Sequence, residues 1–334
     1  MSPAANVTSN LAAVSVVIPS LGNAARLSES LTAAVKAVDR RGVKRDEIIV
    51  VDDSGSSEAA GTVSEILAGL DESLKGRAVR VASTEGNRGF CEAVAKGFLE
   101  ASGRYVLVVQ DDVVVDEGVI DPLVDVLSRS KEIFAVAPRV RASQPEEGVA
   151  STFESAIQLA LVDDRILVRE TGETQEELER GDLPRSVDVV PSSAFLVRKD
   201  EFLGVGGFDG LFSPFDWEDV DLALTVRRQG RTLMEVPKAR AVHRRLPGGL
   251  DEAVEPDLAR AVRERNRLLL RWKHLSTRAE ATEHLVSLWR TVLEAGLAGD
   301  RRTLEEVCLA TARLGAVADS RSKLSGGDGL VLRT

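Results

Sequence analysis

Short apolar runs alternate with helical repeats over the first 140 residues of the chain. The runs are apolar throughout, which is typical of strands buried on both faces of a sheet. Between them, apolar side chains recur every three or four positions, as Leu27, Leu31 and Val35 do behind the candidate N-cap Asn23. The pattern predicts strands at 14–18, 48–51, 79–81, 105–109 and 133–137, and helices over 24–41, 63–70 and 89–101.

This alternation predicts an α/β fold in which helices cover both faces of a parallel sheet. In such sheets, ligands bind at the carboxyl ends of the strands. Two of the predicted strands end in paired acids, Asp52 with Asp53 and Asp111 with Asp112. Their shared placement is the first indication of a functional site.

The pattern changes twice in the rest of the chain. Residues 141–184 interrupt the alternation and are rich in acids, so we expect an acidic insertion with a solvated surface. Strands return at 187–190, 194–197, 233–236 and 240–242, with a helix between 217 and 230. From 250 onward the pattern is helical, and we expect helices over 253–274, 277–295 and 301–317.

Composition narrows the class of protein. With 43% hydrophobic and 29% charged residues among 334, the chain can bury a large core. The net charge of −10 argues against nucleic acid as a partner. Two distant cysteines, Cys91 and Cys308, favour a reducing compartment over a disulfide framework. The polar first ten residues and the lack of a long apolar run lead us to expect a cytoplasmic protein.

Asp111 and Asp112 are candidates for a metal site. Carboxylates at a strand end suit Mg²⁺ or Mn²⁺, which take oxygen ligands and keep positions for phosphate oxygens. The alternative is a pair of solvated turn residues, because acids at strand ends are common. Asp52 and Asp53, followed by a Ser-Gly-Ser turn, leave a similar choice between ligand contact and a helix-capping turn.

A third acidic group opens the helix that is predicted to begin near Trp217. Glu218, Asp219 and Asp221 crowd one turn of this helix. Acids at a helix N-terminus are stabilised by the helix dipole, so capping explains part of the pattern. Three carboxylates in four residues exceed what capping needs, and one of them could act as a general base.

Taken in order, these motifs resemble family 2 glycosyltransferases, especially bacterial rhamnosyltransferase-like members. The resemblance covers residues 14–250 and rests on eight motifs with the predicted strands and helices between them. The motifs are Val-Val-Ile-Pro at 16–19, Val-Val-Asp-Asp-Ser at 50–54, Asn-Arg-Gly-Phe at 87–90, Val-Val-Gln-Asp-Asp at 108–112, Ala-Phe-Leu-Val-Arg at 194–198, Gly-Phe-Asp at 207–209, Trp-Glu-Asp-Val-Asp-Leu at 217–222, and His243.

The resemblance implies the GT-A fold, a nucleotide-sugar-binding α/β fold whose Rossmann-like mixed sheet has helices on both faces. With the pattern of the whole chain, it leads us to expect a tail over 1–12, a catalytic domain over 13–250, a helical C-terminal extension over 251–320 and a tail over 321–334. Within the catalytic domain we expect a nucleotide-binding half at 13–140, the acidic insertion at 141–184 and an acceptor half at 185–250.

The resemblance also implies an activity. A sugar would move, with inversion, from a nucleoside-diphosphate-sugar such as dTDP-rhamnose or a UDP-hexose to a hydroxyl of a glycan or lipid-linked acceptor. Asp219, beside Glu218, matches the acid that removes the proton of the acceptor hydroxyl. Asp112 and His243 match the groups that hold Mg²⁺ or Mn²⁺ on the diphosphate. The other implied donor-site residues are Pro19, Asp52 and Asp53 at the nucleoside, Asn87 and Gly89 in the loop facing the donor, and Asp111.

Two other functions are compatible with parts of the sequence. Gln110 stands where the D-x-D element of the family has its first acid, which leaves open a catalytically degenerate sugar-nucleotide or glycan-binding protein. A dinucleotide-binding oxidoreductase would need a glycine-rich turn after the first strand, where Gly22 stands alone. That second alternative is therefore poor.

The helical C-terminal extension is basic over residues 261–290, in an otherwise acidic chain. Such a helix could make peripheral contact with an anionic membrane. Alternatively, its leucine and tryptophan side chains pack on the catalytic domain. Apolar stripes at helical spacing favour packing.

Overall fold

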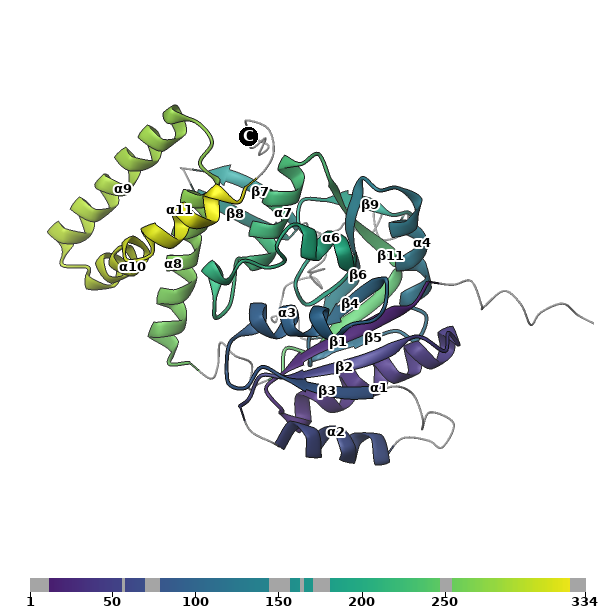
Figure 1. The fold of residues 1–334 in the computed structure, drawn as a ribbon. Coiled ribbons are helices and arrows are strands. Elements are labelled where there is room, and N and C mark those ends of the chain that lie inside the picture. Colours follow the sequence, from purple (N-terminus) through teal and green to yellow (C-terminus); the bar gives the residue numbers. More distant parts are fainter. Residues whose placement is uncertain are drawn as a thin grey trace, which may run out of the picture.

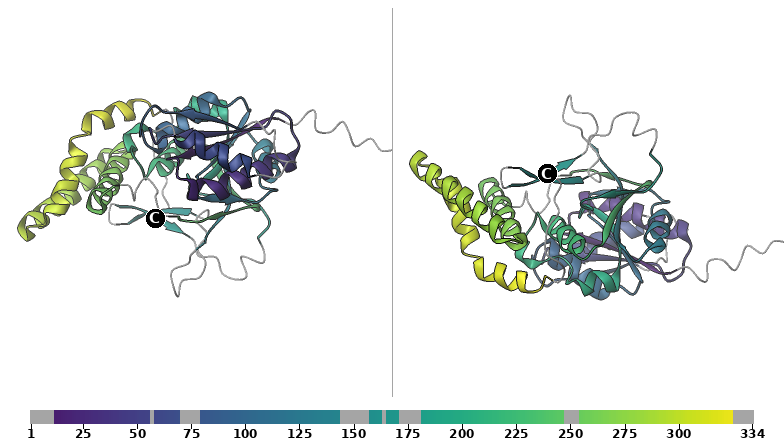
Figure 2. Two further views of the ribbon diagram at one scale, coloured as in Figure 1. Left: turned by 90° about the horizontal axis from the view of Figure 1, so that it is seen from below. Right: turned by 90° about the horizontal axis from the view of Figure 1, so that it is seen from above.

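The computed structural model describes residues 12–55, 58–69, 79–143, 157–162, 165–170, 181–246 and 254–324. Within these residues, nine strands form one sheet and two more form a separate hairpin. Helices cover both faces of the large sheet, and the C-terminal helices extend from one side of it (Figure 1, Figure 2). The expected α/β architecture with a helical C-terminal extension is confirmed.

The N-terminal half contributes the parallel part of the sheet. Its elements are β1 (Val14–Ser20), α1 (Ala24–Arg41), β2 (Glu47–Asp52), α2 (Glu58–Ala68), β3 (Val79–Ser83), α3 (Phe90–Glu100) and β4 (Tyr105–Val109). These strands pair in the order β3–β2–β1–β4, all in parallel. Alternate side chains of β1 enter different cores: Val16 lies with α1, and Val17 lies with α3.

The second half of the domain makes the sheet mixed. Its elements are β5 (Val113–Val115), α4 (Ile120–Arg129), β6 (Ile133–Ala142), β9 (Arg185–Val187), β10 (Ala194–Arg198), α6 (Lys199–Gly204), the short 3-10 helix η2 (Gly210–Phe212), α7 (Glu218–Arg228) and β11 (Thr232–His243). Strand β10 enters antiparallel between β4 and β6. The sheet is therefore mixed, whereas the alternation alone predicted a wholly parallel one.

Strand β11 covers residues 233–236 and 240–242, which the sequence pattern predicted as two separate strands. It pairs in parallel with β6, and the register shifts between Val236 and Arg240. Pro237, which has no N–H to donate, lies at this irregularity. Beyond it, the end of β11 pairs with β5, so that His243 lies opposite Val113.

Part of the expected acidic insertion contributes to the core. Strands β7 (Ile157–Val162) and β8 (Arg165–Glu170) form an antiparallel hairpin, while 144–156, 163–164 and 171–180 lie outside the described residues. Ile157, Leu159 and Ile166 are buried against the catalytic domain. The apolar alternation is short and surrounded by acids, so the sequence suggested a solvated surface instead.

The helical C-terminal extension consists of α8 (Pro256–His274), α9 (Arg278–Ala298), α10 (Arg301–Thr311) and α11 (Leu314–Ser322). Helix α8 buries Leu269, Leu270 and Trp272, as the packing alternative requires. On α9, exposed apolar side chains recur at every fourth position: Leu285, Trp289, Leu293 and Leu297. In the part of the chain that the structure describes, no helix is long and apolar enough to cross a membrane.

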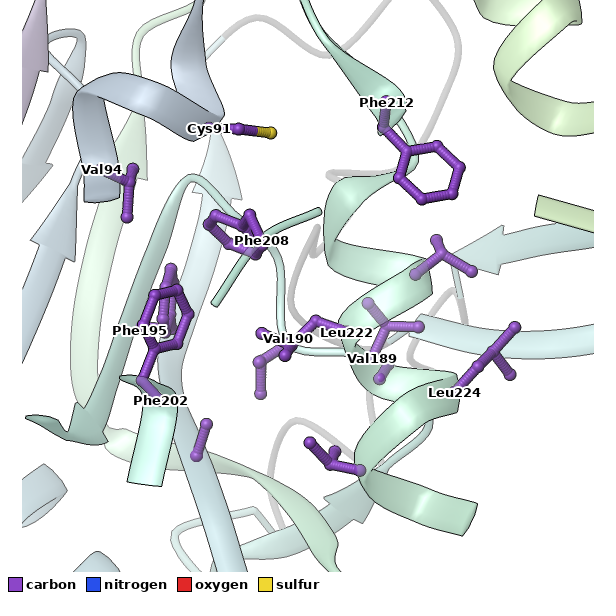
Figure 3. Packing of buried hydrophobic residues seen from close by; sticks show 14 of the residues in the cluster. Cys91, Val94, Val189, Val190, Phe195, Phe202, Phe208, Phe212, Leu222 and Leu224 are labelled. Carbon is purple, nitrogen blue, oxygen red and sulfur yellow. The ribbon is translucent and has the colours of Figure 1, made fainter. Parts of the chain in front are cut away.

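An aromatic cluster fixes the segment before α7. The rings of Phe98 and Phe202 stack with their centroids 4.0 Å apart, and Phe208 meets Phe202 edge-on at 5.4 Å. Figure 3 shows Phe208 and Phe212 among the buried side chains of the same cluster, together with Leu222 and Leu224 of α7. This packing sets the position from which the acids of α7 project.

Candidate active site

The carboxyl ends of β1, β2 and β4 meet at one edge of the sheet, as parallel neighbours must. The hydroxyl of Ser20, the last residue of β1, donates to Asp111 Oδ2 at 2.8 Å. The backbone N–H of Asp53, just after β2, donates to Ser20 O at 2.9 Å. The two predicted acidic pairs therefore lie at one edge, with Ser20 between them.

Arg26 of α1 neutralises the acids after β4. Its Nε lies 2.9 Å from Asp111 Oδ1, and its Nη2 lies 3.1 Å from Asp112 Oδ2. Burial raises the pKa of Asp111, although the charge of Arg26 opposes this. Both oxygens of Asp111 thus contact Ser20 or Arg26, and its role at the donor stays a prediction. Arg26 lies 85 residues from Asp111, and no local pattern in the sequence pointed to it.

Asp112 and His243 meet although they lie far apart in the sequence. The pairing of β5 with β11 and a 2.9 Å bond from Arg244 N to Asp112 O bring their chains together. His243 Nε2 then lies 3.3 Å from Asp112 Oδ1. Burial raises the pKa of Asp112, but His243 and Arg26 lower it by more than burial raises it. The pKa of Asp112 therefore lies below its ordinary value.

This pair fits a divalent cation. Asp112 Oδ1 is buried and accepts no hydrogen bond from the described residues. Two ligands at right angles around Mg²⁺, each roughly 2.1 Å from it, stand about 3 Å apart, close to the observed separation. Within the same residues, no three side chains of His, Cys, Asp or Glu gather as a metal site. Phosphate and water oxygens would therefore have to complete the coordination, as Mg²⁺ commonly requires.

Asp53 holds the loop that precedes α3. Its Oδ1 accepts from Arg88 N at 2.9 Å, and its Oδ2 accepts from Gly89 N at 2.8 Å. Gly89 has a φ of 92°, and a Cβ there would lie 3.0 Å from Pro214 O. Both oxygens of Asp53 therefore support the loop, and its contact with a nucleoside stays a prediction.

The other expected donor-site residues flank this loop. Pro19 is buried in β1, and Asn87 is exposed at the loop itself. Asp52 Oδ1 accepts from the backbone N–H of Ser54 at 2.9 Å and from its hydroxyl at 2.6 Å. Asp52 therefore stabilises the turn that follows β2 and also lies at the carboxyl edge of the sheet.

The acids of α7 form a second group. Glu218 is only 4% exposed, and its Oε2 has no hydrogen-bond partner among the described residues. Asp219 is half-buried, and its carboxylate accepts from Val220 N at 2.7 Å and from Ser192 N at 3.3 Å. Burial, followed by the charge of Asp219, raises the pKa of Glu218 to about 8. Burial also raises the pKa of Asp219, to about 6.

Residues 192 and 193 connect the two groups. Ser193 O accepts from Gln110 N at 2.9 Å, next to Asp111, while Ser192 N donates to Asp219. The hydroxyl of Ser193 is buried without a hydrogen-bond partner in the described part of the chain. One short segment therefore separates an acid–imidazole pair from a carboxylate pair whose pKa values are raised.

The sheet order and the acids at its carboxyl edge define the class: this is an α/β protein of the GT-A fold. The family model described as glycosyl transferase family 2 matches residues 15–190. The chain therefore belongs to glycosyl transferase family 2, a family of enzymes. The matched region includes Asp112 and ends before Asp219 and His243, and the roles of all three residues stay predictions.

Solved structures support the fold. GalNAc-T7 with UDP, GalNAc and Mn²⁺ aligns with a TM-score of 0.59 at 20% identity, over 78% of this chain and 48% of that one. The mannosyltransferase PcManGT from Pyrobaculum calidifontis, with GDP-Man and Mn²⁺, aligns with a TM-score of 0.50 at 14% identity, over 93% and 79%. TarS 1–349 from S. aureus aligns with a TM-score of 0.50 at 13% identity, over 93% and 87%.

The chain spans about half the length of the GalNAc-T7 chain that it matches. No curated protein matches the sequence. At these identities the structures show a shared fold, and none of the three is described as a rhamnosyltransferase. The rhamnosyltransferase-like specificity therefore stays a prediction.

Proposed function

We propose that this protein is an inverting glycosyltransferase that moves a sugar from a nucleoside-diphosphate-sugar to a hydroxyl of a glycan or lipid-linked acceptor. The observation that carries the proposal is the division of the acids into two groups on either side of residues 192–193. Asp112 with His243 forms one group, and Glu218 with Asp219 forms the other. Direct displacement at a sugar carbon needs this division, because one group must stabilise the leaving diphosphate while the other accepts a proton.

Asp112 and His243 are the residues that would hold Mg²⁺ or Mn²⁺. When bound, the ion would supply positive charge opposite the leaving diphosphate. The structures of GalNAc-T7 and PcManGT, which hold Mn²⁺ beside UDP and GDP-Man, support this part of the proposal. Arg26 holds the other oxygen of Asp112, which keeps Oδ1 directed toward His243.

Asp219 is the proposed base. The backbone N–H groups of Val220 and Ser192 orient its carboxylate. Burial raises the pKa of both carboxyl groups, and that of Glu218 more than that of Asp219, so Asp219 is the member of the pair that ionises first as the pH rises. A base works best when its pKa lies near the operating pH. The pair thus combines one proton acceptor with one neutral neighbour that does not repel it.

The donor would lie along the carboxyl edge of β1 and β2. Pro19, Asp52 and Asp53 would line the nucleoside there, and Asn87 and Gly89 belong to the loop that would face the donor. GalNAc-T7 with UDP and PcManGT with GDP-Man support a nucleoside-diphosphate donor for this chain, and experiment must identify the nucleobase. The proposed donors are dTDP-rhamnose and UDP-hexoses.

The proposed function does not require contact between α8 and a membrane. Arg263 Nε is paired with Asp216 at 2.6 Å, and Arg265 Nη2 donates to Ser213 O at 2.7 Å. These arginines therefore contact the protein itself.

The substitution Asp219→Asn separates catalysis from a degenerate, binding-only protein. It keeps the size of the side chain and removes its basicity, so we expect the transfer rate to fall on the order of 10²-fold or more. The dissociation constant for the nucleoside diphosphate should stay unchanged, since Asp219 lies in the other acidic group. If the wild type binds a nucleotide-sugar but hydrolyses or transfers nothing with any acceptor tested, the binding-only alternative replaces the proposal.

A further inference from the structure

We propose that Asn266 of α8 is a positioning residue for the base. It holds the loop 212–217 in the shape that directs Glu218 and Asp219 into the site. The identity of the base rests on the proposed function. The claim that Asn266 holds this loop rests on the contacts alone, and it gives the helical C-terminal extension a part in the reaction.

Asn266 is completely buried and faces the loop through its amide nitrogen. Nδ2 lies 2.6 Å from the carbonyl oxygen of Phe212, 2.8 Å from that of Phe215 and 3.1 Å from that of Asp216. An amide has two N–H donors, so three backbone acceptors share them. Carbonyl groups buried without a donor are costly, which makes this one side chain important to the whole loop.

A neighbouring guanidinium fixes the orientation of this amide. Arg265 Nε and Nη2 lie 3.0 Å and 2.8 Å from Asn266 Oδ1, and Nη2 also donates to Ser213 O. Because a guanidinium can only donate, the amide oxygen must face Arg265. The amide nitrogen is thereby turned toward the carbonyl groups of the loop.

The loop needs such support because its backbone is unfavourable. Asp216 and Trp217 have φ values of 67° and 77°, a left-handed conformation that residues with a Cβ rarely adopt. Asn266 binds the carbonyl groups of Phe215 and Asp216, that is, the peptide groups before and after the left-handed residue Asp216. Trp217 O then accepts from Asp221 N at 2.9 Å in the first turn of α7. The direction in which α7 leaves the loop thus depends on the contact with α8.

The same loop also touches the donor side. Phe90 N donates to Pro214 O at 3.4 Å, and the hydroxyl of Ser213 donates to Arg88 O at 3.3 Å. The loop is therefore in contact with the segment that Asp53 holds. Residues 213 and 214 make those contacts, whereas Asn266 binds mainly residues 215 and 216, which lead to α7. Replacing Asn266 should therefore disturb the position of Asp219 more than the binding of the donor.

Other contacts keep α8 in place without Asn266. Lys273 Nζ lies 2.7 Å from Asp209 Oδ2 and 2.8 Å from Asp221 Oδ2, and His274 Nε2 lies 2.7 Å from Asp221 Oδ1. This buried network anchors the C-terminal end of the helix. A change at Asn266 can therefore disturb the loop while α8 stays docked.

The test is Asn266→Asp, which keeps the shape and turns an oxygen toward the three carbonyl groups. We expect a transfer rate lower by about 10- to 100-fold, as for a reacting group displaced by about 1 Å. Binding of UDP or GDP with Mn²⁺ should change by less than about two-fold, as expected for an effect on the reacting step. Hydrogen exchange of residues 210–221 should become faster. Arg260→Gln is the control, because it removes the ion pair between α8 and Glu306 of α10 and leaves the loop untouched.

Unchanged hydrogen exchange of residues 210–221 in Asn266→Asp, or a transfer rate equal to that of the control, overturns the proposal. If Asn266→Asp does not fold, Asn266→Ala serves instead, since it removes the donors without adding a repulsive oxygen, and the same results are expected. A wild type that binds neither UDP nor GDP contradicts the proposed function for these donors. In that case the exchange of residues 210–221 still decides whether Asn266 holds the loop.

Discussion

Replacing Glu218 by glutamine should stabilise the protein more at alkaline than at acidic pH. Burial raises the pKa of this carboxyl group from its ordinary value of 4.5 to about 8 in the folded protein. Between pH 4.5 and about pH 8, Glu218 is ionised in the unfolded chain and protonated in the folded protein. Folding therefore becomes less favourable as the pH rises from about 4.5 to 8, and the penalty is complete above pH 8. Glutamine has no proton to lose and escapes this penalty.

The size of the effect follows from the same values. Each pH unit between them corresponds to about 1.4 kcal/mol, so the interval from pH 5 to 8 corresponds to at most about 4 kcal/mol. Part of the shift comes from the charge of Asp219, which titrates in the same range. We therefore expect the stability gained by Glu218→Gln to be about 2 to 4 kcal/mol larger at pH 8.5 than at pH 5.

Urea unfolding of the wild type and of Glu218→Gln at pH 5 and pH 8.5 measures this difference directly. The control is Glu117→Gln, whose side chain is 57% exposed at the surface. It should give the same small change at both values of pH. Equal effects of Glu218→Gln at pH 5 and pH 8.5 would refute the argument, since burial would then impose no charge penalty on this carboxyl group.

Two further substitutions test how the sheet edge is built. Gly97→Ala should lower the free energy of unfolding by about 1–3 kcal/mol, because the new Cβ would stand 2.3 Å from Val17 Cγ1 in the core; an unchanged urea midpoint would show that α3 can move away from β1. Asp53→Asn should cost about 1–3 kcal/mol and weaken nucleotide binding, because the amide NH2 group that replaces one carboxylate oxygen cannot accept from the N–H of Arg88 or Gly89 that faces it. Calorimetric titration with UDP or GDP checks the second effect, and wild-type affinity together with wild-type stability would contradict it.

Local patterns predicted the elements and the acids well. Uninterrupted apolar runs mark β1, β2 and β4, and the acids that follow β2 and β4 lie at the carboxyl edge where they were expected. The crowding of acids at Glu218 and Asp219 indicated a group that capping alone does not explain. These features depend on residues close together in the sequence, which periodicity can report.

Partners that come from distant segments could not be predicted in this way. In the sequence, nothing distinguishes Arg26 from the other polar residues of its helix, and only the order of the strands in the sheet brings it to Asp111. Asn266 likewise lies in a basic helix whose pattern says which face is buried but not against which loop. The antiparallel entry of β10 between β4 and β6 has the same cause, because a periodic pattern does not specify the neighbour of a strand.

The central claim is a metal-assisted donor site at Asp112 and His243. The most direct measurement is the melting temperature of the wild type and of Asp112→Ala with UDP, GDP or dTDP, each with and without Mn²⁺. One nucleoside diphosphate at about 100 times its dissociation constant should stabilise the wild type by about 2.7 kcal/mol, and only with Mn²⁺. Asp112→Ala should lose this stabilisation. Melting temperatures that no nucleoside diphosphate changes, with or without Mn²⁺, would contradict the account.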